Sequence, residues 1–112
     1  MDCIFCKIVN NEVPSDRIYE DEKVLAFHDT NPQAPVHFLV IPKKHIKNFR
    51  EISADDLGLI SHIFGVIQNI SNELNLNDGL RIVNNCGENG GQTVDHIHFH
   101  VLAGRPLSWP PG

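Results

Sequence analysis

The sequence lacks any apolar run that approaches the roughly 20 residues needed for a membrane-spanning helix. It also lacks a basic start followed by an apolar stretch and a cleavage site, the pattern of a secretory signal. Lysine and arginine are scattered singly through a chain of formal net charge −5, so no basic patch is available to neutralise the phosphates of a duplex. We therefore predict a cytoplasmic protein whose partners include neither membranes nor duplex nucleic acid.

Cysteine is scarce, with Cys3, Cys6 and Cys86 as the three examples. An odd count that includes a close CxxC pair does not suit a secreted disulfide framework. Taken alone, the pair Cys3 and Cys6 leaves three alternatives open: metal ligands, a redox couple, or two reduced thiols without a special role. Cys86 is given no role, because most lone cysteines are inert packing residues.

The composition is that of a folded protein. Hydrophobic residues make up 41% of the chain and charged residues 21%, which is too apolar for a disordered segment. A length of 112 residues suits one compact unit with one core. We predict a single domain over residues 1–112.

The pattern of apolar and turn-forming residues predicts an α+β domain. Residues 3–10 indicate a short helical or irregular opening, and residues 17–20 and 23–28 indicate a β-hairpin. Further strands are predicted at residues 38–41, 80–84 and 94–103.

A long helix is predicted to begin at Ser53, which suits the N-cap position, with Asp55 and Asp56 in the first turn. Turn chemistry at residues 77–79 ends it. Its apolar residues follow helical spacing: Leu57, Ile60, Ile63, Phe64, Val66, Ile67, Ile70 and Leu74. This broad stripe favours packing of the helix on a sheet.

Three histidines alternate with apolar residues near the end of the chain. His96, His98 and His100 should share one face of the last predicted strand, because strand side chains alternate between faces. Three imidazoles are poor material for a core, since each buried ring needs hydrogen-bond partners. A functional role is therefore favoured, either as a metal site or in nucleophilic catalysis on phosphorus. The preceding stretch Gly90–Thr93 favours phosphate chemistry, because its backbone can approach phosphate oxygens.

These residues resemble the signature of the histidine-triad family, HxHxH with apolar residues between and after, which is met by His96 to Leu102. Other segments resemble the Hint branch of that family: residues 4–5, 26–29, 32–35, 37–45, 90–94 and 109–112. The resemblance implies a HIT-like fold, with a five-stranded antiparallel sheet, one long helix and a short N-terminal helix. It also implies a homodimer in which the two sheets join, and hydrolysis of purine nucleoside phosphoramidates and related acyl-nucleotides.

The same resemblance implies the catalytic roles. His98 attacks the α-phosphorus and forms a nucleotidyl-histidine intermediate that water resolves, which is two-step covalent catalysis. The main-chain carbonyl of His96 holds the other ring nitrogen of His98, while His37 and His100 donate to the phosphoryl oxygens. Thr93 occupies a position where many Hint-like proteins carry serine, and its hydroxyl is expected beside the phosphate.

The nucleotide contacts are likewise carried over from the family. Asp29 is expected to bind the ribose hydroxyls, and Asn85 to lie beside the phosphate and the leaving group. Gly91 and Gln92 are expected along the phosphate, and Trp109 is expected to reach the active site of the partner. The expected base pocket consists of Ile4, Phe5, Phe27, His28 and Leu39. The purine nucleotide product is AMP or GMP.

Some bacterial members with a CxxC pair bind structural zinc, and the resemblance assigns the ligands here to Cys3, Cys6, His45 and His96. Two thiolates and two imidazoles form a closed tetrahedral set, which suits structural zinc and leaves no position for a catalytic water. No catalytic metal is expected. Strict alternation would put His96 on the same face as His98, so the strand must bend near its start for this set to form.

Two alternatives to a nucleotidyl hydrolase come from other classes. The first is a non-catalytic nucleotide-binding or scaffold protein with the same pocket. The second is a metallohydrolase that uses the three histidines as zinc ligands, although no acidic residue follows His100 to complete such a site. Within the family, dinucleoside-polyphosphate hydrolase and nucleotidyltransferase activities are further alternatives.

Overall fold

A five-stranded antiparallel sheet organises the computed structural model, which describes residues 3–112. Residues 1 and 2 of the predicted domain lie outside the described residues. The order across the sheet is β1-β2-β3-β5-β4, so β5 is inserted between β3 and β4. The strands are β1 (Arg17–Glu20), β2 (Val24–His28), β3 (Val36–Pro42), β4 (Leu80–Val83) and β5 (Phe99–Ala103). The predicted fold class is confirmed.

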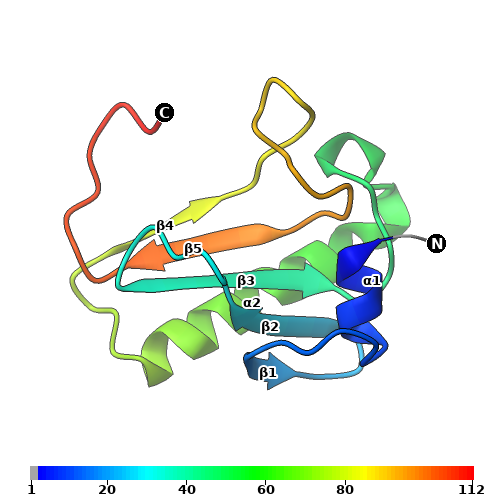
Figure 1. Ribbon diagram of the computed structural model, residues 1–112, viewed down its shortest axis with the longest axis horizontal. Helices are drawn as coiled ribbons and strands as arrows, with labels where there is room; N and C mark the ends of the chain where they lie inside the picture. The colour runs from blue at the N-terminus through cyan, green and yellow to red at the C-terminus, as the bar shows by residue number, and fades with distance from the viewer. Residues whose placement is uncertain (1–2) are drawn as a thin grey trace.

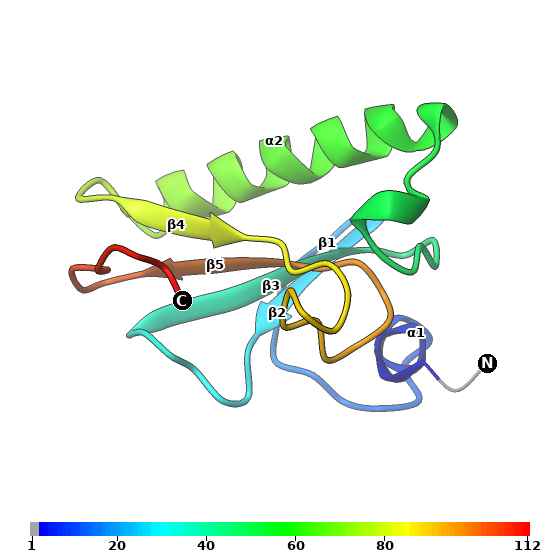
Figure 2. The same cartoon turned by 90° about the horizontal axis from the view of Figure 1, so that it is seen from above.

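Two helices cover opposite faces of this sheet, as Figure 2 shows. The long helix α2 (Leu57–Glu73) crosses one face, and the short helix α1 (Ile4–Val9) packs on the other, at the end where β3 finishes and β5 begins (Figure 1). The strand β2 is buried on both sides, because Val24 and Ala26 join the core under α2 while Leu25 and Phe27 join the core under α1. Burial on both faces explains why its sequence is continuously apolar.

The start of the long helix matches the prediction closely. The backbone N–H of Ser53 donates to Asp56 Oδ2 at 3.1 Å, and Lys44 Nζ donates to Asp56 Oδ1 at 2.6 Å. The first turn, Ala54–Asp56, is a 3₁₀ turn, so the α-helix itself begins at Leu57. The helix ends at Glu73, before the predicted turn at 77–79, and Asn75 just beyond it adopts a left-handed backbone with a φ of 56°.

The predicted strand at residues 94–103 is too long. Regular pairing begins only at Phe99, and residues 94–98 follow an irregular path in which Ile97 N–H donates to Ile46 O at 2.7 Å. His96 and His98 therefore precede the strand, and His100 alone of the three lies on β5. The bend anticipated near His96 is present, and the expectation that all three histidines share one strand face is wrong.

The apolar stripe of α2 divides into two surfaces. Ile63, Val66, Ile67 and Ile70 are buried against the sheet. Leu59 and Ile60 are half-buried at the margin of this core. Other large apolar side chains are exposed, and they include Leu57, Phe64 and Leu74 of the helix region and Leu80 and Ile82 of β4. Among the described residues, no helix is both long and apolar enough to cross a membrane.

Candidate functional site

A cavity of about 370 Å³ opens between α1, the end of β2 and the segment that leads into β5. Most of the predicted nucleotide-binding residues line it, namely Ile4, Phe5, Phe27, His28, Asp29, Leu39, Thr93, His98 and His100. The sequence analysis missed Ile8, Val13, Pro14, Thr30 and Val94, which also line it. Ile8 lies one helical turn after Ile4, so helical spacing was a usable signal for it, whereas the turn at Val13 and Pro14 carries no motif.

Other predicted site residues lie outside the lining of this cavity. His37 is buried behind His100, with ring centroids 5.2 Å apart. Asn85 lies beside Gly91, because a β-carbon added at Gly91 would lie 3.8 Å from the side-chain nitrogen of Asn85. Trp109 is 82% exposed. A single chain therefore gathers the residues predicted to bind the base and the ribose together with His98 and His100, while Trp109 is left on the surface.

His98 is held in one tautomer. Its Nδ1–H donates to the main-chain oxygen of His96 at 2.8 Å, and the side chain is only 4% exposed. Burial lowers the pKa of His98, partly offset by the hydrogen bond to His96 and the charge of Asp29. The ring is therefore neutral near pH 7, and its Nε2 carries a lone pair. Phe5 packs edge-on against the same ring, with centroids 5.1 Å apart.

The tautomers of His37 and His100 are also fixed, by consecutive hydrogen bonds. The backbone N–H of Gln33 faces His37 Nδ1 at 3.0 Å, so this nitrogen must accept, and the ring proton lies on Nε2. That Nε2–H donates to His100 Nδ1 at 2.9 Å and lies 3.4 Å from Asp29 Oδ2. The proton of His100 consequently lies on its Nε2, and burial lowers the pKa of His100 to about 4. His100 can therefore offer a neutral N–H donor.

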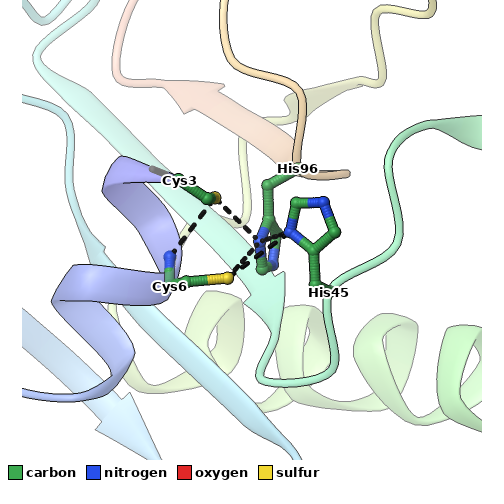
Figure 3. Close-up of side chains that lie close together, drawn as sticks. All are labelled: Cys3, Cys6, His45 and His96. Atoms are coloured by element: carbon green, nitrogen blue, oxygen red, sulfur yellow. Dashed lines mark hydrogen bonds between the residues drawn. The ribbon is translucent and has the colours of Figure 1, made fainter. Parts of the chain in front are cut away.

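The four predicted metal ligands converge at the N-terminal end of α1 (Figure 3). His96 Nδ1 lies 3.4 Å from Cys3 Sγ, 3.6 Å from Cys6 Sγ and 3.2 Å from His45 Nδ1, and Cys6 Sγ lies 3.4 Å from His45 Nδ1. A zinc ion bound tetrahedrally at about 2.3 Å to sulfur and about 2.0 Å to nitrogen needs ligand atoms about 3.3 to 3.8 Å apart. The four side chains fit such an ion.

The second ring nitrogen of His96 is also placed as a metal site requires. His96 Nε2–H donates to Pro42 O at 2.8 Å, which leaves Nδ1 without a proton and directed at the cluster. The pKa of His96 is lowered to about 4, mainly by burial and also by His45 and His98. A ligating histidine usually has this arrangement, with one nitrogen on the metal and the other donating to a carbonyl.

Asp29, His37 and His100 form a second compact group, with ligand atoms within 4.8 Å of one another. In this group His37 Nδ1 accepts a hydrogen bond from the backbone N–H of Gln33. A neutral His37 cannot accept at Nδ1 and also offer a lone pair at Nε2, so this group does not fit a metal. Because His96 turns into the other cluster, the three histidines of the motif form no common metal site, and the metallohydrolase alternative loses its ligands.

The Gly-rich loop is closed by the side chain of Gln92. Its Oε1 accepts from Gly87 N at 2.9 Å, and its Nε2 donates to Lys47 O at 2.8 Å and Val94 O at 2.9 Å. A β-carbon at Gly90 would collide with the Cys86 carbonyl oxygen, and Gly91 has a φ of 85°. The Gln92 side chain thus braces the loop that carries Thr93 to the cavity.

Comparisons with known proteins point to one family. A family model described as the HIT domain matches residues 10–107. An uncharacterized HIT-like protein of Synechococcus elongatus is 50% identical over 111 residues, which cover 99% of this chain and 97% of that protein.

Solved structures give the same result. A HIT family hydrolase from Legionella pneumophila has a TM-score of 0.97 at 44% identity, with 99% of this chain and 100% of that chain covered. A histidine triad protein from Clostridium difficile has a TM-score of 0.94 at 51% identity, with 96% and 95% covered. A histidine triad nucleotide-binding protein from Candida albicans has a TM-score of 0.83 at 34% identity, with 97% and 83% covered.

Proposed function

The chain belongs to the HIT domain family, and from that membership we propose that it hydrolyses purine nucleoside phosphoramidates and acyl-nucleotides through a nucleotidyl-histidine intermediate. The observation that carries the proposal is the fixed tautomer of His98, whose Nδ1–H is held by the His96 carbonyl at 2.8 Å. The Nε2 lone pair of His98 is therefore available as a nucleophile beside the cavity.

The reaction proceeds in two displacements. His98 Nε2 attacks the α-phosphorus as the P–N or P–O bond to the leaving group breaks. The leaving group takes the bonding electron pair and departs as an amine, after gaining a proton from solvent, or as a carboxylate. Water then attacks the same phosphorus and gives up a proton to solvent, the bond from phosphorus to His98 Nε2 breaks, and the nucleoside monophosphate and neutral His98 are released. The Nε2–H of His100 donates to a phosphoryl oxygen in both steps, where negative charge must be stabilised. His37 was also expected to donate to the phosphoryl oxygens, but its one ring proton is directed at His100 Nδ1, so we assign it the role of supporting the His100 donor.

The rest of the cavity accommodates the nucleoside. The purine ring packs among apolar side chains of α1, β2 and β3, including Phe5, Phe27 and Leu39. Asp29 Oδ1 already accepts from Asn31 N–H at 2.8 Å, and the carboxylate has further lone pairs for the ribose hydroxyls. Thr93 lies on the same cavity wall and offers its hydroxyl to the phosphate or the leaving group.

The cluster of Cys3, Cys6, His45 and His96 is proposed to bind structural zinc. When bound, zinc would cross-link the start of α1, the segment after β3 and the segment before β5, with no open coordination position. The backbone N–H of Cys6 lies 3.4 Å from Cys3 Sγ, which suits a thiolate acceptor. Thiolate ligands need a reducing compartment, which supports the predicted cytoplasmic location.

A homodimer is proposed to form through β4. This strand pairs with β5 on one side only, and within residues 3–112 no strand covers its other edge. Exposed Phe64, Leu80 and Ile82 lie on and beside that edge, and burying such a surface against a second copy would continue the sheet. The partner would also cover Trp109, which is 82% exposed in one chain.

Steady-state hydrolysis of a fluorogenic adenosine phosphoramidate tests the proposed function. We expect turnover by the wild type and a loss of at least about 10³-fold in His98→Ala, because the nucleophile is removed. His62→Ala is the matched control, since His62 lies on α2, on the face of the sheet opposite to α1, where it pairs with Asp21, and the variant should keep wild-type activity. Tight AMP binding by a wild type that shows no turnover would instead establish the alternative of a non-catalytic nucleotide-binding protein.

A further inference from the structure

An arginine outside the cavity is connected to its histidines. Arg105 follows β5 on the surface, and its Nη2 and Nε both donate to the main-chain oxygen of Gln33, at 2.9 Å and 3.3 Å. Its Nη1 donates to Pro106 O at 2.9 Å. The planar guanidinium group therefore clamps one carbonyl in the loop between β2 and β3 with two of its donors.

We propose that Arg105 is a positioning residue that fixes the main chain of Gln33, and through it the tautomers of His37 and His100. The chain of contacts is continuous. The Gln33 carbonyl is held by Arg105, the Gln33 N–H donates to His37 Nδ1 at 3.0 Å, and His37 Nε2–H donates to His100 Nδ1 at 2.9 Å. This role rests on the proposed function, in which His100 Nε2–H donates to the phosphoryl group.

The turn that carries Arg105 is built to lie against this loop. Gly104 has a φ of 94°, in the left-handed region that favours glycine. A β-carbon at Gly104 would come within 2.9 Å of Pro35 Cβ, so only glycine allows the approach. Two independent contacts, Gly104 on Pro35 and Arg105 on Gln33, therefore dock the turn on the loop. Within the loop, Gln33 Nε2 also donates to Asn31 O at 3.0 Å.

The consequence of losing the clamp follows from the chemistry of imidazole. If the Gln33 N–H turns away, His37 can carry its proton on Nδ1, and its Nε2 then becomes an acceptor toward His100. His100 must in turn place its proton on Nδ1, which leaves a lone pair on Nε2. That lone pair would face the phosphoryl oxygens and repel them. Without any change of net charge, His100 would change from a donor into an acceptor at the phosphate.

The test compares Arg105→Met with the wild type by kinetics, by AMP binding and by ¹⁵N NMR of the histidine ring nitrogens. One hydrogen bond of about 1 kcal/mol corresponds to about a fivefold shift in an equilibrium, so we expect kcat to fall about fivefold or more while KM and the AMP dissociation constant change less. The ring nitrogens of His37 and His100 should move toward the opposite tautomer. Arg105→Lys should recover part of kcat, because it retains the charge and one donor.

Lys23→Met is the matched control, because it also removes an exposed positive charge but lies in the turn before β2, at the opposite end of that strand from Asp29. It should keep the wild-type rate and tautomers. Wild-type ring tautomers in a folded Arg105→Met protein would overturn the proposal, whatever its rate. If Arg105→Met does not fold, Arg105→Gln serves as the second variant with the same expected and contradicting results. Because the NMR measurement needs no turnover, it decides the role of Arg105 even if the wild type proves inactive and the proposed function fails.

Discussion

The two histidine clusters use the same side chain for opposite purposes, and the difference comes from the main chain around them. In the cluster at α1, His96 Nε2–H donates to the Pro42 carbonyl, so its Nδ1 presents a lone pair toward Cys3, Cys6 and His45, as the proposed zinc site requires. In the cavity, His37 Nδ1 accepts from the Gln33 amide, so its Nε2 presents a proton. When one ring nitrogen donates to a main-chain carbonyl, the other nitrogen carries a lone pair and can bind a metal. When one ring nitrogen accepts from a main-chain amide, the other nitrogen carries the proton and can donate.

The two clusters meet in one residue. The side chain of His96 belongs to the cysteine cluster, while its main-chain oxygen accepts from His98 Nδ1 at 2.8 Å. Phe5 lies between Cys3 and Cys6 in the sequence and packs on both rings, with centroids 5.9 Å from His96 and 5.1 Å from His98. A cluster that holds a metal therefore also supports the wall of the cavity behind His98.

Of the changes proposed here, loss of a zinc ligand from the cysteine cluster should have the largest effect on the free energy of unfolding. A ligand present at 1,000 times its dissociation constant stabilises the folded state by about 4 kcal/mol, so Cys6→Ser should lose bound zinc and about that much free energy of unfolding. Metal analysis and urea unfolding at saturating zinc would measure both. Cys86→Ser is the matched control, because Cys86 lies outside the cluster. Equal zinc content in the two variants would contradict the assignment of the ligands.

The next effect concerns the donor in the cavity. His100→Ala should lower kcat by about 10²-fold or more, about 3 kcal/mol, because a donor to the developing phosphoryl charge is lost. Bound zinc should remain at the wild-type level, since His100 lies outside the cysteine cluster. His100→Gln retains an N–H donor and should lose less. A His100→Ala protein with nearly wild-type kcat would show that the cavity histidine is dispensable.

The free energy of unfolding should depend on pH through His100 in the cavity. The folded-state pKa of His100 is about 4, against about 6.5 for a histidine in an unfolded chain, with burial as the main cause. Between these values the unfolded chain binds a proton that the folded protein excludes. The contribution is therefore complete above about pH 6.5 and is lost as the pH falls toward 4.

Because the His100 side chain is 20% exposed, solvent screening reduces this contribution to about 2 kcal/mol. Urea unfolding of the wild type and of His100→Gln at a series of pH values between 4 and 7 would measure it. The variant should show a shallower decline than the wild type toward low pH. Parallel curves for the two proteins would mean that His100 titrates at its ordinary value in the folded state.

The sequence predicted the elements better than their arrangement. The strand over residues 17–20 was predicted with its observed bounds, because alternation and turn residues are local signals. The insertion of β5 between β3 and β4 has no local signal and depends on packing of the whole sheet. The exposed Leu57 and Phe64 were predicted as part of the core stripe, because helical spacing does not distinguish the core from a second apolar surface.

The residues of the site were predicted from the family resemblance, and their orientation was predicted from the alternation of side chains along a strand. The second prediction failed at the start of the predicted strand 94–103. It placed His96 beside His98, whereas the backbone before Phe99 turns His96 to the opposite cluster. The resemblance covered residues 32–35, but nothing in the sequence assigned a role to the Gln33 amide or to Arg105, because a main-chain donor has no residue type and the contact spans 72 positions. The resemblance thus named the His96 carbonyl that holds the proton of His98, whereas the groups that fix the protons of His37 and His100 were not predicted.

The smallest expected effect lies at the base end of the cavity. The residues there are mainly apolar, and apolar contacts discriminate between similar ligands by only about 1 to 3 kcal/mol. We expect the dissociation constants of AMP and GMP, measured by calorimetry, to differ by less than about tenfold, or about 1.4 kcal/mol. Stronger discrimination would require a polar contact to the base, for which His28 and Thr30 are the candidates on the cavity wall. His28→Ala and Thr30→Val would then identify the side chain that hydrogen-bonds to the base. In that case directional hydrogen bonds would act at the base end of the cavity as well as in the two histidine clusters.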